Sequence, residues 1–254
     1  MAEVLVIDIG NTSAHWAVVA DRRVTQRGDV HRDHLITELP TILSASNGPV
    51  SWCSVVPATA DNLSAALNAA DRPHWRLTCD DAPGLTITYE RPQQIGQDRL
   101  ANALGAQALV SESVVVIDMG TATTFDIVSA SQGFIGGIIA PGLASMTHYM
   151  HEKTALLPQL SEEDFDPSLR IGRSTVQAMS VGCTRGYPGM IRGMLEGVRE
   201  EYAALGEAEP AVVLTGGAAR GFLRDALAEF RAEPDLTLLG LAEAQRRRIA
   251  IADG

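Results

Sequence analysis

The pattern of hydrophobic and polar residues predicts strands that alternate with helices along the whole chain. Short apolar runs that end at glycine, asparagine or proline are typical of strands, and longer runs rich in alanine and leucine are typical of helices. The first half predicts strands at 4–8, 14–20, 24–27, 50–55 and 75–79, with helices at 33–45, 58–70 and 97–111. The second half predicts strands at 114–118, 124–129, 134–139, 211–215 and 236–239, with helices at 143–153, 174–205, 218–230 and 241–249. This alternation indicates an α/β protein.

The second half of this pattern repeats the first. The segments Val-Ile-Asp8-Ile-Gly10 and Val-Ile-Asp118-Met-Gly120 stand 110 residues apart, and each opens a run of three strands. A repeat of this size indicates two similar domains. We place the boundary near Glu112 and expect an N-terminal domain at 1–112 and a C-terminal domain at 113–254.

Charge and composition exclude several classes of protein. Acidic residues outnumber basic ones by 31 to 20 and the net charge is −11, which argues against binding to nucleic acid or to an anionic membrane. Lys153 is the single lysine and follows no glycine-rich run, so the chain has no Walker A loop, and we expect this lysine at the surface. No apolar run reaches the ~20 residues of a membrane span. The sequence indicates no signal peptide, and we expect a cytoplasmic protein.

The cysteines, a pair of histidines and a run of arginines indicate no catalytic or metal-binding site. Cys53, Cys79 and Cys183 are isolated and odd in number, so we expect free thiols rather than disulfides or zinc ligands. His31 and His34 lie in a polar stretch, where surface positions are a better interpretation than a metal pair. The basic run at 246–248 ends a predicted helix, where arginine interacts favourably with the helix dipole, and we interpret it as structural.

Two carboxylates at strand ends are candidates for binding phosphate and cations. Asp8 and Asp118 each stand two residues before the glycine of a predicted turn. Backbone N–H groups of such a turn bind anions, and a carboxylate supplies oxygen to a hard cation. One copy alone is better explained as an ordinary turn, but two copies at equivalent places favour the functional interpretation. For Gly216-Gly217, which follows a strand, ligand binding and a simple strand-to-helix turn both stay open.

Asp98 is the candidate general base. It stands in Gly96-Gln97-Asp98-Arg99 at the start of a predicted helix. A carboxylate held there could accept a hydroxyl proton during phosphoryl transfer, and an N-cap of the helix is the alternative. Arg99 could clamp an anionic substrate with two hydrogen bonds, and a surface ion pair is the alternative.

Together these motifs resemble those of the type III pantothenate kinases. Asp8-Ile-Gly-Asn-Thr, Gly96-Gln-Asp-Arg99, Asp118-Met-Gly-Thr121 and Gly216-Gly217 occur in the order and spacing of that family, and segments 136–142, 154–158 and 171–175 are similar to it too. The resemblance implies two duplicated ribonuclease-H-like domains of the actin-like ATPase type with a cleft between them. It further implies ATP-dependent phosphorylation of pantothenate to 4′-phosphopantothenate, the first step of coenzyme A biosynthesis. Members are typically cytoplasmic homodimers that use Mg²⁺ and a monovalent cation, K⁺ or NH₄⁺.

The resemblance also implies a role for individual residues. Asp98 is the proton acceptor, and the implied substrate-binding residues are Tyr89, Gly96, Gln97, Asp98, Arg99 and Thr175. For Tyr89 a half-buried strand aromatic, and for Thr175 a place in the first turn of a helix, are the alternatives. Asp118 is the implied ligand of the monovalent cation, and Asp8 lies near Mg²⁺, directly or through water. The implied ATP-binding residues are Asp8, Ile9, Gly10, Asn11, Thr12, Ser13, Ala14, His15, Thr121, Gly216 and Gly217.

Two other functions stay open at this point. The phosphate turns alone also fit another small-molecule kinase of the same fold, because only residues around Asp98 concern the acceptor. Some relatives of the family are described as accessory factors in transcription, so a non-catalytic regulatory protein is the second alternative. The presence of both Asp98 and Asp118 argues against a protein without turnover, and the acidic chain argues against direct contact with DNA.

Overall fold

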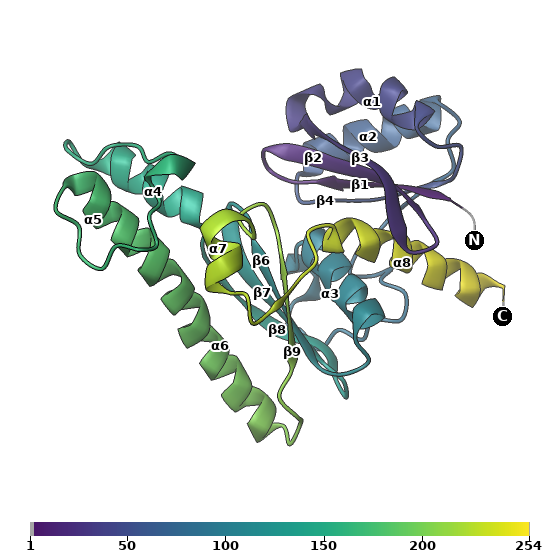
Figure 1. The fold of residues 1–254 in the computed structure, drawn as a ribbon. Coiled ribbons are helices and arrows are strands. Elements are labelled where there is room, and N and C mark those ends of the chain that lie inside the picture. Colours follow the sequence, from purple (N-terminus) through teal and green to yellow (C-terminus); the bar gives the residue numbers. More distant parts are fainter. Residues whose placement is uncertain (1–2, 254) are drawn as a thin grey trace. The chain divides into compact units, whose positions relative to one another are not determined.

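The structure is a computed structural model that describes residues 3–253 and divides into two compact units. Unit 1 contains the chain up to Ser111, the short segment Ser131–Ile135 and the chain from Asp235 onwards. Unit 2 contains Glu112–Ala130 and Gly136–Pro234. Each unit is built around one β-sheet (Figure 1).

The sheet of unit 1 has five strands in the order β3-β2-β1-β4-β5. β1 runs antiparallel to β2 and parallel to β4, β3 is antiparallel to β2, and β5 is parallel to β4. The hairpin turn between β2 and β3 has positive φ at both Asp21 (47°) and Arg22 (61°), as a type I′ turn requires. The strands are β1 (Val4–Ile9), β2 (Ser13–Ala20), β3 (Arg23–His31), β4 (Val50–Ser54) and β5 (His74–Arg76).

The second sheet has the same topology as the first. Its order is β10-β9-β6-β7-β8, with β6 antiparallel to β7 and parallel to β9, and β9 parallel to β10. Strands β6 to β10 correspond in chain order to β1 to β5, and each occupies the same place in its sheet as its counterpart. The predicted duplicated α/β fold is therefore confirmed. The strands are β6 (Val114–Met119), β7 (Ala122–Ser129), β8 (Gly133–Pro141), β9 (Ala211–Thr215) and β10 (Arg231–Ala232).

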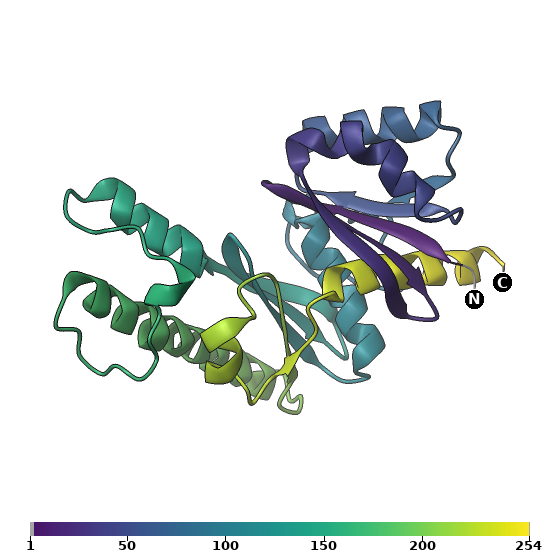
Figure 2. The ribbon, with the colours of Figure 1, turned by 45° about the horizontal axis from the view of Figure 1, so that its top comes forward.

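Helices cover both faces of the sheet in unit 1 (Figures 1 and 2). Alternate residues of β1, beginning with Leu5, pack with α1 (Leu35–Ser44) and α2 (Pro57–Ala69) in one apolar cluster. The other residues of β1, Asp8 among them, face the opposite side, because successive side chains of a strand point to opposite faces. That side carries α3 (Gln97–Leu109) and α8 (Leu236–Ala252), and Ser51 of β4 donates a hydrogen bond to Leu241 of α8 at 3.2 Å. Asp8 therefore shares a face with α3.

Helix α8 replaces the predicted strand at 236–239, so that prediction was wrong. The run Leu-Thr-Leu-Leu has the short apolar character of a strand, but Leu236, Leu241 and Ala244 are all buried and α8 packs on α3. Tertiary packing has overridden the local preference. The two helices approach closely at Gly105 and Gly240, because neither residue has a side chain.

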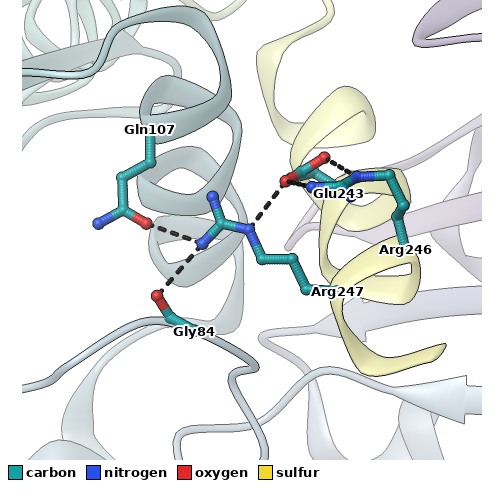
Figure 3. A network of polar contacts seen from close by, with 5 residues as sticks. All are labelled: Gly84, Gln107, Glu243, Arg246 and Arg247. Atoms are coloured by element: carbon teal, nitrogen blue, oxygen red, sulfur yellow. Dashed lines mark hydrogen bonds and ion pairs between the residues drawn. The ribbon is translucent and has the colours of Figure 1, made fainter. Parts of the chain in front are cut away.

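The arginine run at 246–248 lies inside α8 and is structural, although not at the end of the helix as predicted. Figure 3 shows Arg246 and Arg247 converging on the buried carboxylate of Glu243, with N–O distances of 2.6–2.8 Å. Arg247 also donates to Gly84 and to Gln107 of α3. Burial alone would raise the pKa of Glu243, but the hydrogen bonds from both arginines bring it below its ordinary value. The network joins α8 to α3 and to the loop before it.

Gly240→Ala is expected to destabilise unit 1. A Cβ at this position would overlap the carbonyl oxygen of Ala101, which is backbone of α3 and cannot rotate away. Overpacking of this kind costs about 3 kcal/mol, and thermal or urea unfolding measures it. Gly193→Ala in α6 is the matched control, because nothing lies within 4 Å of its Cβ position, and alanine in an exposed helix should stabilise by up to about 1 kcal/mol. Equal effects of the two changes would contradict the close packing.

Unit 2 carries four α-helices among its described residues. α4 (Leu143–Lys153) has the predicted bounds, and the predicted helix at 174–205 is α5 (Thr175–Val181), a π-helical turn at Gly182–Gly186 and α6 (Tyr187–Ala204) in one continuous run (Figure 2). α7 (Gly221–Ala226) is much shorter than the predicted 218–230. Its late start is local in origin, since Gly221, the first residue of α7, has a φ of 52°, which lies outside the right-handed helical region.

The surface predictions for Lys153, His31 and His34 are confirmed. Lys153 is exposed and pairs with Glu152, and both His31 and His34 are exposed. The three cysteines are free thiols. Among residues 3–253 no helix is both long enough and apolar enough to span a membrane. The remaining short helices are 3₁₀ turns at Arg32–His34, Pro92–Gln94 and Glu162–Asp164.

Candidate functional site

The turn between β1 and β2 presents open backbone N–H groups beside Asp8. It spans Gly10 to Thr12, and Gly10 donates to the carbonyl of Ser13 at 2.9 Å. Asn11 and Thr12 are exposed, and within the described residues their N–H groups donate no hydrogen bond. Such a turn can bind an anion.

The predicted ATP-binding residues that flank this turn differ in what they expose. Ile9 and Ala14 are fully buried, so only their backbones could touch a ligand. His15 is exposed, but its Nδ1 lies 2.6 Å from Asp29 Oδ1 on the neighbouring strand. Ser13 is half-buried.

Cys53 of β4 is part of this site, although the sequence analysis did not assign it a role there. It stands opposite Asp8 in the parallel pairing of β1 and β4. Its thiol is fully buried and donates a hydrogen bond to Asp8 Oδ1 at 3.2 Å. Burial raises the pKa of the Cys53 thiol, and the negative charges of Asp8 and Asp98 raise it further. Both carboxylates therefore lie near this one thiol. A single cysteine in a strand carries no pattern that could have predicted this contact.

Asp98 lies in the first turn of α3 and is half-buried. The interpretation of Asp98 as the N-cap is wrong, because the N-cap is Gly96. Instead, Asp98 Oδ1 accepts a hydrogen bond from the N–H of Arg99 at 2.8 Å. Burial raises the pKa of Asp98, although the Arg99 N–H and guanidinium oppose the shift. A carboxylate of raised pKa in a partly enclosed site is suited to accept a proton.

Gly96 is required for the position of this carboxylate. A Cβ on Gly96 would overlap Asp98 Oδ1. The backbone of Gly96 is otherwise ordinary, with φ −57° and ψ 136°. The constraint therefore comes from the Asp98 side chain and not from backbone strain.

Gln97 holds the start of α3 against the sheet. Its side-chain oxygen accepts hydrogen bonds from the N–H of Ser54 at 3.1 Å and from Arg76 Nε at 3.2 Å. Ser54 is the last residue of β4 and Arg76 the last of β5. These contacts hold the first turn of α3 at the carboxyl ends of β4 and β5.

Arg99 and Tyr89 are joined by Phe134, which the sequence analysis did not include in the site. Arg99 is only 6% exposed, so the surface ion-pair interpretation is wrong. Its guanidinium carbon lies 5.5 Å from the centre of the Phe134 ring, within cation–π range. The Tyr89 ring meets Phe134 edge-on, with centroids 6.1 Å apart. A pocket of about 440 Å³ lies beside Tyr89, with Glu90, Arg91, Gln94 and Ile135 as its other lining residues.

Phe134 reaches this place because the start of β8 belongs to unit 1. Its backbone oxygen accepts the N–H of Thr88 at 3.0 Å, and Ile87 pairs with it as an isolated bridge. Gly133 makes the approach possible, since a Cβ there would overlap Thr86 and its φ is 77°. A sequence pattern could not predict a contact between segments so far apart in the chain.

The equivalent site of unit 2 contains Asp118 at the end of β6. The following turn is Gly120-Thr121, and Gly120 donates to Ala122 at 3.0 Å. The Thr121 carbonyl accepts from Gly142 at 3.1 Å and from the Ser145 hydroxyl at 2.6 Å, both at the start of α4. The exposed side of the turn is therefore held by the helix that follows β8.

Gly216 packs directly on Asp118. A Cβ at Gly216 would overlap Asp118 Oδ1 and would stand 2.7 Å from Met119 N, and φ is 89°. Gly217 is exposed and has nothing within 4 Å of its Cβ position. The structure thus brings Asp118, Thr121 and Gly216 together in unit 2. Thr175 is the exposed first residue of α5, after the N-cap Ser174.

The oxygen ligands present fit a hydrated divalent cation and a monovalent cation. Within residues 3–253 no three His, Cys, Asp or Glu side chains cluster as a metal site. Mg²⁺ needs no such cluster, because it keeps several waters and takes one or two carboxylates together with substrate phosphates. Half-buried Asp8 and Asp118, each beside a backbone turn, match that requirement.

Solved structures share this fold. A glucokinase of the ROK family from Streptomyces griseus has a TM-score of 0.54 at 10% identity, covering 95% of this chain and 98% of its own. Component A of (R)-2-hydroxyglutaryl-CoA dehydratase from Acidaminococcus fermentans has a TM-score of 0.54 at 13% identity, covering 98% and 100%. These likenesses, with the two sheets of equal topology, place the chain in the actin-like ATPase class of folds.

Sequence comparisons identify the family within that class. A sequence model of the type III pantothenate kinase matches residues 4–197. The type III pantothenate kinase of Akkermansia muciniphila is 44% identical over 74% of each chain, and that of Paramagnetospirillum magneticum is 34% identical over 96% of each. The chain belongs to the type III pantothenate kinase family, and it is a phosphotransferase enzyme.

Proposed function

We propose that this chain transfers the γ-phosphoryl group of ATP to the 4′-hydroxyl of pantothenate, the first step of coenzyme A biosynthesis. The observation that carries the proposal is Asp98, a half-buried carboxylate of raised pKa that lies beside Gly96 and the buried Arg99. Family membership supplies the donor and the acceptor.

Asp98 accepts the hydroxyl proton in this proposal, while nearby groups bind the rest of pantothenate. Phosphoryl transfer asks the protein mainly for positioning and charge stabilisation, so a base that orients the hydroxyl is sufficient. Arg99 and Tyr89, both packed on Phe134, bind the acceptor. The backbone N–H of Gly96 and the side-chain amide of Gln97 also contribute to acceptor binding. Thr175, exposed at the start of α5, is a further acceptor contact.

The turn from Asp8 to His15 binds the ATP phosphates in this proposal. The N–H groups of Asn11 and Thr12 donate to phosphate oxygens, with the backbones of Ile9, Gly10, Ser13 and Ala14 shaping the turn. Asp8 holds Mg²⁺ directly or through water. Bound Mg²⁺ supplies positive charge that neutralises the phosphate oxygens.

Residues of unit 2 make further proposed nucleotide and cation contacts. Thr121 binds phosphate, and Gly216 and Gly217 bind the nucleotide through their backbones. Asp118 holds the monovalent cation, K⁺ or NH₄⁺. The predicted domains, 1–112 and 113–254, then each carry one carboxylate of the repeated turn. We also propose a cytoplasmic homodimer that binds neither nucleic acid nor membranes.

The acceptor site distinguishes the proposed function from two alternatives. Another small-molecule kinase would retain the phosphate turns, and a non-catalytic regulatory protein would need no base. The contact of buried Arg99 and half-buried Tyr89 with Phe134, and the pocket beside Tyr89, favour an enzyme with a defined acceptor.

Release of ADP tests the proposal. The purified chain with MgATP is expected to release ADP when pantothenate is added, and to do so faster in K⁺ or NH₄⁺ than in Na⁺ alone. A coupled pyruvate kinase and lactate dehydrogenase assay would itself require K⁺, so ADP is measured by chromatography. Glucose and acetate serve as control acceptors. No pantothenate-dependent ADP would refute the activity, and equal rates in Na⁺ and K⁺ would refute only the cation role.

A further inference from the structure

Arg32 contacts the turn between β1 and β2 through two donors. It begins the 3₁₀ turn directly after β3, where Ser13 pairs with His31. The N–H of Arg32 donates to the carbonyl of Thr12 at 3.0 Å, and its Nη1 donates to the carbonyl of Asn11 at 2.6 Å. The carbonyl oxygens of Asn11 and Thr12 are therefore both bound by one residue.

These contacts fix the direction of a peptide group. The Asn11 carbonyl and the Thr12 N–H belong to the same peptide unit, and in a trans peptide they point in opposite directions. No cis peptide occurs among the described residues. When Arg32 holds the Asn11 oxygen, the Thr12 N–H is directed away from Arg32. A rotated peptide would instead present a carbonyl oxygen to an anion, which repels it.

The charge of Arg32 is already balanced. Its Nε and Nη2 donate to Asp33 Oδ1 at 3.0 and 2.9 Å. These hydrogen bonds, with the positive charge of Arg32, lower the pKa of Asp33. The guanidinium is therefore largely neutralised by Asp33, and Arg32 affects a bound phosphate by holding the turn instead of by direct contact.

We propose that Arg32 is a positioning residue, which holds the turn so that its N–H groups face the β- and γ-phosphates of the nucleotide. The inference rests on the proposed ATP binding by this turn, but not on pantothenate as the acceptor. No pattern in the sequence marks Arg32, because it lies 20 residues beyond Thr12, in the 3₁₀ turn that follows β3.

Direct nucleotide binding tests this role. Arg32→Ala removes the contact to Asn11 and leaves the backbone contact to Thr12. We expect about a tenfold weaker affinity for the non-hydrolysable ATP analogue AMPPNP with Mg²⁺, measured by titration calorimetry, because one hydrogen bond to a charged group is lost. The affinity for AMP, which lacks the β- and γ-phosphates, should change less than twofold, and Tm should stay the same. Arg27→Ala is the control, since Arg27 lies on β3, the strand directly before Arg32, and pairs with Asp235 instead of the turn.

Each outcome decides the proposal. Weaker AMPPNP binding with unchanged AMP binding supports it. An unchanged affinity for AMPPNP, an equal loss for both nucleotides, or an equal loss in Arg27→Ala overturns it. Because the readout is binding, a chain that bound ATP but failed to phosphorylate pantothenate would refute the proposed acceptor and leave this test intact.

Discussion

Asp98→Asn is expected to lower turnover by ~10²–10⁴, the usual contribution of a general base, while ATP affinity changes little. Asparagine has nearly the same shape and still accepts a hydrogen bond from the Arg99 N–H, as Asp98 does at 2.8 Å. It cannot take a proton from the acceptor hydroxyl. Pantothenate-dependent ADP release measures the loss, and calorimetry with AMPPNP checks that nucleotide binding is retained.

The pH dependence of turnover gives an independent test of the same residue. Burial raises the pKa of Asp98, and only the deprotonated carboxylate can act as a base. Activity should therefore fall as the pH decreases through that raised value, and the residual activity of Asp98→Asn should lose this limb of the profile.

The same pKa shift has a consequence for stability. A carboxyl whose pKa is higher in the folded chain binds more protons when folded, so its ionisation lowers stability as pH rises from 3.8 through the raised value. Asp98→Asn removes that penalty at pH 7. We expect its Tm at pH 7 to equal or exceed that of the parent chain.

Asp61→Asn is the matched control for these measurements. Asp61 also lies on a helix of unit 1 but is exposed, so neither turnover nor Tm should change. Full turnover in Asp98→Asn would show that another group takes the proton.

Much of the fold could be predicted from the sequence because its determinants are local. The strands and glycine turns around Asp8 and Asp118 depend on apolar runs and on residues within a few positions of each other. The error at 236–239 arose where packing of α8 on α3 through Gly240 decided the structure, which no local pattern contains.

Some residues of the candidate site could likewise be predicted from local sequence, and others could not. Asp98 and Gly96 are neighbours in sequence, so a motif can carry both. Cys53, Phe134 and Arg32 enter the site through strand pairing and tertiary contact. Each looks like an ordinary core or surface residue in the sequence, because its role depends on a partner 21 or more residues away.

Gly96→Ala is expected to lower turnover by about 10², because a displacement of a catalytic group by about 1 Å has an effect of that size. Its Cβ would overlap Asp98 Oδ1, and the carboxylate must rotate away. The obstacle is the end of a flexible side chain and φ of −57° suits alanine, so the free energy of unfolding should change by less than about 1 kcal/mol. Turnover by ADP release and stability by urea unfolding, measured on one preparation, separate the two effects.

The double variant Gly96→Ala with Asp98→Asn tests whether the glycine acts through the carboxylate. If it does, Gly96→Ala has no catalytic carboxylate to displace once Asp98 is replaced by asparagine. The double variant should then be no slower than Asp98→Asn alone. Gly197→Ala on α6, with open space at its Cβ position, controls for a general effect of replacing glycine. Multiplied losses in the double variant would mean that Gly96 contributes independently of Asp98, for example by direct contact of its backbone with the acceptor.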